Sequence, residues 1–292
     1  MKHAVLGAGA IGGLMATALS AIGEDTTLIV RPHKLSGHPE RLTLERPTGT
    51  ITASVRVAAK LTQPVDVLWI ATKAHDLQPA LDAVEVPSGI VVPLLNGTDH
   101  VPPLHARFGH ERVVPGTIAV EAERLANGHF AQRSGVRLSV AAKGEPVLRD
   151  VFARLEAQLG FVCQFVEDEP KLLWTKLSFL APFALITSAS GKNKGEIFAD
   201  AEWKAKLSAA FAEAAAVAKA YGAEIDIAKL RAGFESFPDA MRSSMAKDLV
   251  AGRKLELDAI AGPILRGAEK FGIAVPVTRE LVAAIESQVT SR

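Results

Sequence analysis

Three glycines with a fixed spacing stand near the start of the chain and could bind a pyrophosphate. They follow a short apolar run at residues 2–6 and precede a helix-forming segment at residues 14–19. In a strand–turn–helix unit, the first glycine permits a tight turn, the second lets the backbone approach a pyrophosphate, and the third lets helix and strand pack closely. The pattern therefore predicts a dinucleotide-binding loop at a helix N-terminus, formed by Gly7, Ala8, Gly9, Ala10, Ile11 and Gly12.

Three more polar side chains follow predicted strands. Arg31 follows the strand expected at residues 26–30, and Lys73 comes soon after the one expected at residues 65–71. Asn96 follows residues 90–95 in the same way. In open α/β sheets, ligands bind beyond the carboxyl ends of the strands, so we expect these side chains and the glycine loop to share one binding edge.

Arg31 bears on the choice of dinucleotide. About 20 residues beyond the glycine loop, an acidic residue typically binds the ribose 2′-hydroxyl of NAD, whereas an arginine accommodates the 2′-phosphate of NADP. Arg31 occupies that place, with His33 and Lys34 close by. The sequence therefore favours NADP(H) over NAD. The alternative is that Arg31 is only a solvated strand end.

The remaining pattern predicts an α/β protein with two domains. Residues 1–167 carry the strand signals, including a strand pair at 41–45 and 50–57, and residues 168–292 are mainly helical. Further strands are expected at 113–120 and 136–142, with a helix at 146–159. In the second domain, Asp200 is expected to cap a helix that runs to Tyr221, and Pro263 to kink or interrupt another at 257–268.

Composition narrows the class of protein. The chain has 292 residues, of which 48% are hydrophobic and 22% charged, which is enough to bury a sizeable core. A net charge of +1 without a basic stripe argues against a nucleic-acid partner. The single cysteine, Cys163, excludes an internal disulfide and a cysteine-rich metal site, and it favours a cytoplasmic location. We predict no metal.

We also expect no membrane span. The longest later apolar stretch, residues 178–191, is too short to cross a bilayer and contains Pro182. The uncharged run at residues 4–23 leaves a signal peptide or anchor as an alternative, although its glycines make it a poor apolar helix.

A proton donor for redox chemistry must come from the second half of the chain or from the strand ends. All eight histidines lie between His3 and His129, so the helical domain offers no histidine as an acid. A ketone that accepts a hydride still needs a proton on its oxygen. Lysine is then the obvious donor.

The combination of motifs resembles the ketopantoate reductase (2-dehydropantoate 2-reductase) family over nearly the whole chain. The resemblance rests on Gly7-x-Gly9-x-x-Gly12, Arg31, Thr72-Lys73-Ala74, Leu95-Asn96-Gly97, Leu173-Trp174-Thr175-Lys176-Leu177, Gly195-Glu196, Ser243-Ser244-Met245 and Gly272-Ile273-Ala274-Val275-Pro276. It implies a Rossmann-type domain followed by an all-α domain like the C-terminal domain of 6-phosphogluconate dehydrogenase. It also implies NADPH as the hydride donor and an active site in the cleft between the domains.

The resemblance assigns roles to individual residues. Lys176 matches the general-acid lysine of the family, and Glu256 matches its substrate-positioning carboxylate. Ser244 matches a hydroxyl that contacts the acid group of the substrate. Lys73 and Asn96 match residues at the cofactor and at the edge near the nicotinamide, where Asn96 also faces the substrate.

The chain departs from the family pattern at three positions that we place at the substrate. Leu180, Ala184 and Lys194 stand where the family has asparagines. Leu180 and Ala184 follow Lys176 at intervals of four, which puts the three residues on one helix face and predicts that apolar neighbours lower the pKa of the lysine. Losing amide donors also changes which acid fits.

The sequence thus predicts NADPH-dependent reduction of a small 2-oxo acid. The leading substrate is 2-dehydropantoate, whose product pantoate leads to pantothenate and coenzyme A. Two alternatives stay open: a reductase of a more apolar 2-oxo acid, and a non-catalytic NADP(H)-binding protein. The helical half could carry a homodimer interface, although packing within the domain also explains its apolar stripes.

Overall fold

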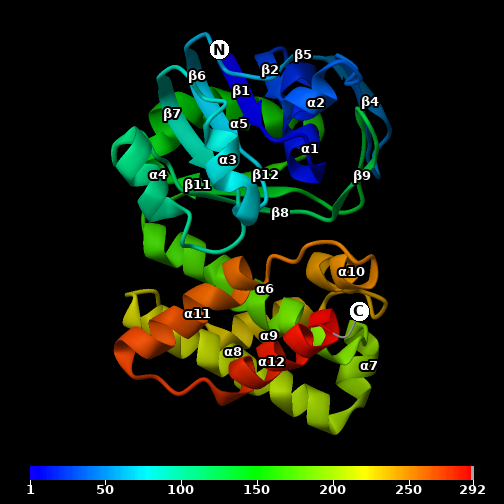
Figure 1. Cartoon of the computed structure of the whole chain (residues 1–292), viewed down its shortest axis with the longest axis vertical. Coiled ribbons are helices and arrows are strands. Elements are labelled where there is room, and N and C mark those ends of the chain that lie inside the picture. Colours follow the sequence, from blue (N-terminus) through cyan, green and yellow to red (C-terminus); the bar gives the residue numbers. More distant parts are fainter. Residues whose placement is uncertain (291–292) are drawn as a thin grey trace. The chain divides into compact units, whose positions relative to one another are not determined.

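The computed structural model describes residues 1–290, which divide into two compact units (Figure 1). The first unit comprises residues 1–95 and 100–172, and the second comprises residues 96–99 and everything described from Leu173 onward. The segment 96–99 therefore follows a strand of the first unit along the chain but packs with the second.

A parallel sheet organises the first unit. Its strands lie in the order β5, β2, β1, β6, β7, with bounds Arg56–Ala58, Asp25–Ile29, Lys2–Leu6, Val65–Ile70 and Ser88–Pro93. Each neighbouring pair is parallel. Taken in chain order, these strands follow the arrangement of the first five strands of a Rossmann fold, which confirms the predicted fold class.

Residues of the central strands alternate between the two faces of this sheet. In β1, Val5 packs into one apolar cluster, whereas Ala4 and Leu6 pack into another on the opposite face. Both clusters are fully enclosed, as expected for parallel strands that are covered on each side. Helix α1 (Ala10–Ala21) covers the first face and begins directly after the glycine loop.

Two smaller sheets complete the first unit. One has the order β4, β3, β10, β9 (Ile51–Ser54, Arg41–Glu45, His129–Gln132, Ala122–Ala126), and the other has the order β12, β11, β8 (Val162–Val166, Arg137–Ala141, Gly116–Ala119). The short helices of this unit are α2 (Pro32–Leu35), η1 (Ala74–Asp76), α3 (Leu77–Leu81), α4 (Val101–Phe108) and η2 (Ala142–Gly144), and α5 spans Glu145–Leu159.

One predicted strand proved to be two. Residues 50–57 do not form a single partner for β3, because β4 ends at Ser54 and β5 begins at Arg56. Strand β4 pairs antiparallel with β3, whereas β5 pairs parallel with β2 in the main sheet. The buried Val55 lies between them, where the chain passes from one sheet to the other. Strands β9, β10 and β12 were not predicted.

The second unit is helical. Its elements are α6 (Glu169–Ser190, which begins in the first unit), α7 (Lys194–Ala199), α8 (Ala201–Ala220), α9 (Ile227–Glu235), α10 (Ser244–Val250), α11 (Leu257–Phe271) and α12 (Pro276–Thr290). Their buried faces form one apolar cluster, with phenylalanine side chains of α6, α8 and α9 in mutual contact.

The predicted cap of α8 is confirmed. Of the two outcomes predicted for Pro263, a kink or an interruption, the interruption does not occur. The Asp200 carboxylate accepts hydrogen bonds from the backbone N–H groups of Glu202 and Trp203 at the start of α8. In contrast, α11 continues through Pro263. A proline cannot donate to the carbonyl four residues earlier, so that of Ala259 lacks its usual helical partner.

Helix α6 is the one described helix that is long and apolar enough to cross a membrane, although the sequence suggested a shorter apolar stretch. Two thirds of its most apolar window is buried inside the protein. That burial is typical of the core helix of a globular domain, which passes the same length and composition test.

Candidate active site

The glycine loop joins β1 to α1 in a conformation that depends on its glycines. Gly7 has a φ of +107°, which disfavours any side chain. A Cβ on Gly12 would lie 1.7 Å from the carbonyl oxygen of Gly7, so the helix can approach the turn this closely only without a side chain. Gly9 caps α1 without any side-chain hydrogen bond. The backbone N–H groups of the first turn thus remain suited to an anion, and the loop fits a dinucleotide pyrophosphate.

The ends of β1 and β6 are neighbours. A Cβ on Gly7 would lie 3.1 Å from both the carbonyl oxygen of Ala71 and the Cγ2 methyl of Thr72. Lys73 follows directly, half-buried, at the N-cap of η1. The structure therefore brings the glycine loop and the segment that carries Lys73 to one edge of the sheet.

Arg31 already has an anionic partner. It stands at the N-cap of α2, and its Nη2 donates to Oδ2 of Asp76 over 2.7 Å. Both side chains are solvent-accessible, with exposed fractions of 63% for Arg31 and 36% for Asp76. His75 lies 3.6 Å from the same carboxylate oxygen. Sequence reasoning missed Asp76, although its place soon after Lys73 could have drawn attention to it.

Lys176 lies in α6 and has a perturbed pKa. Burial lowers the pKa of its ammonium from 10.5 to about 8, and the negative charge of Glu256 opposes this shift. Glu256 is half-buried at the N-cap of α11. The predicted direction of the pKa shift is confirmed. At neutral pH the lysine is still mostly protonated, yet it releases its proton far more readily than a solvated lysine.

Asn96 meets Glu256 within the second unit. Its Nδ2 lies 3.4 Å from Oε2 of Glu256, a long and weak hydrogen bond. The two residues are 160 positions apart in the sequence. Together with the charge interaction between Glu256 and Lys176, this contact links three of the predicted site residues.

The three departures from the family pattern have different surroundings. Leu180 and Ala184 follow Lys176 in α6, where Leu180 is partly buried and Ala184 is completely buried in the helical core. Lys194 is buried at the start of α7, and its ammonium donates to the carbonyl oxygens of Glu235 and Phe237 and to the Asp239 carboxylate. All three of its donors are therefore satisfied inside the protein.

The two adjacent serines differ sharply. Ser243 is buried and caps α10, where its hydroxyl also contacts that of Thr187 over 2.7 Å. Ser244 is exposed at the first position of α10. Ser243 is thus a structural residue, whereas the hydroxyl of Ser244 is open to solvent.

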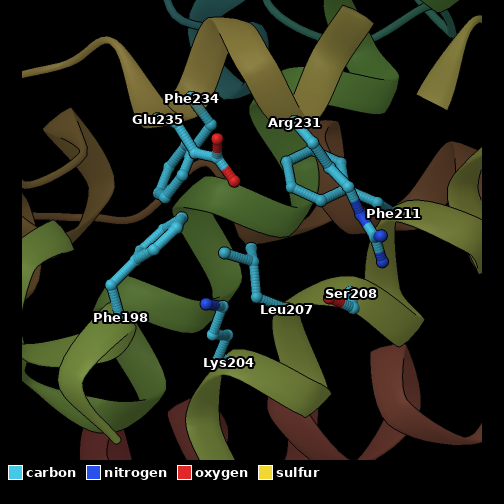
Figure 2. Close-up of a pocket in the computed structure, with 8 residues that line it drawn as sticks. All are labelled: Phe198, Lys204, Leu207, Ser208, Phe211, Arg231, Phe234 and Glu235. Carbon is cyan, nitrogen blue, oxygen red and sulfur yellow. The ribbon is translucent and has the colours of Figure 1, made fainter. Parts of the chain in front are cut away.

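A small cavity of about 70 Å³ lies elsewhere in the helical unit, between α7, α8 and α9 (Figure 2). Its walls are aromatic and aliphatic side chains with charged groups among them: Phe198, Lys204, Leu207, Ser208, Phe211, Arg231, Phe234 and Glu235. The ammonium groups of Lys194 and Lys204 both lie 5.3 Å from the centre of the Phe198 ring. None of the residues that line the cavity is a predicted site residue. Lys194, which is one, only contacts the ring of the lining residue Phe198.

Among residues 1–290, no group of three or more His, Cys, Asp or Glu side chains is arranged to hold a metal ion. The chemistry of the described site residues is that of an ammonium, a carboxylate, an amide and a backbone anion cradle.

Comparison with known proteins identifies the family. The model of the "Ketopantoate reductase PanE/ApbA" family matches residues 3–144, and the model of its C-terminal domain matches residues 170–288. A 2-dehydropantoate 2-reductase of Caulobacter vibrioides is 32% identical over 97% of this chain and 98% of its own length. The chain therefore belongs to the ketopantoate reductase family. It is an oxidoreductase with NADP(H) as its cofactor.

Three further proteins are similar to this chain at lower identity. An uncharacterized oxidoreductase of Bacillus subtilis, YkpB, is 26% identical and covers 98% of both chains. Among solved structures, a ketopantoate reductase from Ralstonia eutropha JMP134 has a TM-score of 0.87 at 24% identity, covering 100% of this chain and 99% of its own. A D-mandelate dehydrogenase solved with NADH and anilino(oxo)acetate has a TM-score of 0.88 at 21% identity, with the same coverage. These two likenesses establish the fold.

Proposed function

We propose that this protein reduces a small 2-oxo acid to the 2-hydroxy acid with NADPH, and that 2-dehydropantoate is its preferred substrate. One observation carries the proposal. In a chain of the ketopantoate reductase family, burial brings the pKa of Lys176 to about 8, and the Glu256 carboxylate acts on the same ammonium. A lysine with a pKa near the working pH is suited to general-acid catalysis.

The proposed reaction divides into a hydride step and a proton step. NADPH held by the glycine loop would supply the hydride for the ketone carbon, and the electron pair of the carbonyl π bond would then reside on oxygen. Lys176 donates a proton to that oxygen and is left as a neutral amine, which solvent reprotonates. The ammonium also stabilises the negative charge that develops on the oxygen during the transfer.

The polar residues near Lys176 orient the substrate in this proposal. Glu256 accepts a hydrogen bond from a substrate hydroxyl and keeps Lys176 protonated through its charge. Asn96 holds the Glu256 carboxylate in place and presents its amide to the substrate. Ser244, with its exposed hydroxyl, binds the acid group.

The cofactor is assigned to residues 1–167, and the substrate and proton donor to residues 168–292 together with Asn96, which packs with the second unit. The glycine loop from Gly7 to Gly12 binds the pyrophosphate, and Lys73 binds nearby. Arg31 binds the 2′-phosphate of NADPH, for which it must exchange its present partner Asp76. These assignments follow from the chemistry of the side chains and their places at the strand ends.

A more apolar 2-oxo acid is the second candidate substrate. It is favoured by Leu180, which follows Lys176 along α6, is only partly buried and offers no hydrogen-bonding group from its side chain. Ala184 is equally apolar but is completely buried in the helical core. Lys194 does not compensate, because its donors are engaged by Glu235, Phe237 and Asp239. A hydroxyl on the substrate would then depend on Glu256 and Asn96.

The deciding experiment is a comparison of substrates. Loss of NADPH absorbance is followed with purified protein and 2-dehydropantoate, beside pyruvate and 2-oxoisovalerate, which is branched but lacks the hydroxymethyl group of 2-dehydropantoate. We expect 2-dehydropantoate to have the highest kcat/KM. A preference for 2-oxoisovalerate would favour the second candidate, and NADPH binding without turnover of any oxo acid would contradict the proposal.

We further propose that the protein works as a homodimer in a reducing cytoplasm. A solved ketopantoate reductase of Staphylococcus aureus, with a TM-score of 0.80 at 20% identity, is described as dimeric. Cys163 is unpaired, and burial raises the pKa of its thiol to about 12, so it does not react readily as a thiolate. Light scattering on the purified protein tests the assembly, and the mass of a monomer at micromolar concentration would contradict it.

A further inference from the structure

The guanidinium of Arg266 joins two segments that are far apart in the sequence. Arg266 lies in α11, and its Nε donates to Oδ2 of Asp99 over 2.9 Å, with a second bond from Nη2 to the same oxygen. Its Nη1 donates to Oδ1 of Asp258 over 2.7 Å. The planar guanidinium, called the fork below, therefore binds two carboxylates that are 159 positions apart in the sequence, those of Asp99 and Asp258.

Each of these carboxylates follows closely after a proposed site residue. Asp99 is three residues beyond Asn96, and Asp258 is two residues beyond Glu256. The two site residues are themselves in contact, through the 3.4 Å approach of the Asn96 amide to the Glu256 carboxylate. Arg266 thus ties together the two chain segments that must stay side by side for this contact to exist.

The backbone of segment 96–99 also contacts α11 directly at Gly97. Gly97 has a φ of +81°, and a Cβ at that position would lie 2.1 Å from the carbonyl oxygen of Ala259. Ala259 is the residue whose carbonyl loses its helical partner because of Pro263. The segment therefore packs directly on the first turn of α11, and only glycine permits the approach.

The helix leaves room for the guanidinium. A Cβ on Gly262 would lie 2.1 Å from Nη2 of Arg266 and 2.7 Å from Oδ1 of Asp258. The missing side chain at Gly262 therefore makes the space in which the fork meets Asp258.

The ion pairs themselves contribute little to stability. Arg266 and Asp99 have exposed fractions of 51% and 50%, and Asp258 is exposed at 85%. Exposed pairs of this kind add little to the free energy of unfolding, because water screens their charges. Burial opposes the charge of Arg266, but hydrogen bonds to Asp258 and Asp99 outweigh it and raise the pKa of the guanidinium. The consequence of the network is the placement of the loop rather than the stability of the fold.

We propose that Arg266 is a positioning residue of the active site: by holding Asp99 and Asp258, it keeps Asn96 against Glu256. Asp99 and Gly262 serve the same function, since one anchors the loop and the other makes room for the fork. This inference rests on the proposed function for its effect on turnover, but the placement of segment 96–99 is a property of the protein without substrate.

The first test therefore needs no catalysis. Hydrogen exchange of backbone amides in segment 96–99 and in the first turn of α11 is compared between the wild type and Arg266→Met. We expect exchange in segment 96–99 to become about tenfold faster, with the rest of α11 unchanged. Lys206→Met is the matched control, because the Lys206 ammonium also bridges two exposed carboxylates, of Glu202 and Glu280, but touches no site residue. Unchanged exchange in Arg266→Met would overturn the inference.

A second variant, Gly262→Ala, distinguishes a local effect on segment 96–99 from a general loss of stability. In Gly262→Ala the new methyl group displaces the flexible end of Arg266, while alanine favours the helical conformation over glycine. We expect this variant to unfold at the same or a higher temperature than the wild type and yet to show faster exchange in segment 96–99. A stable variant with unchanged exchange would contradict the role of the fork.

The link to the active site is tested by a double-mutant cycle with Asn96→Ala. If Arg266 acts through Asn96, Arg266→Met lowers kcat/KM for the oxo acid about fivefold to tenfold, mainly through KM, and adds less than about twofold in the Asn96→Ala background. Arg266→Lys, which keeps the charge but cannot fork to both carboxylates, falls in between. Independent effects that multiply would overturn the inference. An inactive wild type would instead reject the proposed function and leave the exchange result standing.

Discussion

The two units hold their proposed functional residues in different ways. In the first unit, the anion cradle between β1 and α1 is made of backbone, and its residues lie within six consecutive positions, Gly7 to Gly12. In the second unit, the site consists of side chains from distant segments: Asn96, Lys176 and Glu256. The backbone cradle depends on glycines, because a side chain at Gly7 or Gly12 would clash with neighbouring backbone. The side-chain group depends instead on the contacts that hold the segments around Asn96 and Glu256 together.

Removal of the proposed proton donor is expected to have the largest effect. Lys176→Ala should lower kcat for reduction of the oxo acid about 100-fold to 10,000-fold, the usual contribution of general acid catalysis. Fluorescence titration should show that NADPH still binds, because the anion cradle lies in the other unit. Lys192→Ala, which removes a half-buried lysine of the same unit that is paired with Asp200, is the control. Activity within tenfold of the wild type would show that another group supplies the proton.

Substitutions of two glycines of the loop should distinguish the packing of α1 on the turn from the binding of NADPH. Gly12→Ala should lower the melting temperature and abolish NADPH binding, because its methyl group would overlap the carbonyl of Gly7. Gly9→Ala should leave the melting temperature nearly unchanged, since a Cβ there meets only one atom, at 4.0 Å. Its affinity for NADPH should nevertheless fall about 10-fold to 100-fold, because the methyl group would keep the pyrophosphate from approaching the backbone. Equal effects of the two substitutions on stability would contradict this account.

Substitutions of Arg31 and Asp76 should have smaller effects, and these should appear in the preference for NADPH over NADH. Arg31→Ala is expected to weaken NADPH binding about fivefold and to leave NADH binding unchanged, because the residue is largely exposed. Asp76→Asn should act in the opposite direction and tighten NADPH binding by about twofold to fivefold, since it frees the guanidinium. The dissociation constants of both cofactors are measured by fluorescence titration. Glu85→Gln, which breaks the exposed pair with Lys60 in the same unit, is the control, and equal changes for both cofactors would rule out a role at the 2′-phosphate.

The difference between the units also explains what could be predicted from the sequence. The glycine loop and the residues after β2 and β6 were predicted because parallel strands end at one edge, and local pattern is enough to find the strands. Asp200 as the cap of α8 is equally local. The passage of residues 50–57 from one sheet to the other was not predictable in this way, because the pairing partners β3 and β2 decide it.

The contacts that assemble the side-chain site carry no local signal. Asp99 and Arg266 are 167 positions apart, and Asn96 and Glu256 are 160 apart. No periodicity or short motif connects them. The distinction between Ser243, which is buried as a cap, and Ser244, which is exposed, likewise depends on where α10 begins.

The pH dependence of turnover tests the central claim most directly, namely that Lys176 donates the proton from a site that lowers its pKa. Because the protonated form is the acid, kcat/KM for reduction should be constant at low pH and fall as pH rises through about 8. The charge of Glu256 raises the pKa of Lys176, so Glu256→Gln should move this fall to lower pH as well as reduce the rate. A profile that stays level until the ordinary lysine pKa of 10.5, or one that Glu256→Gln leaves in place, would contradict the account.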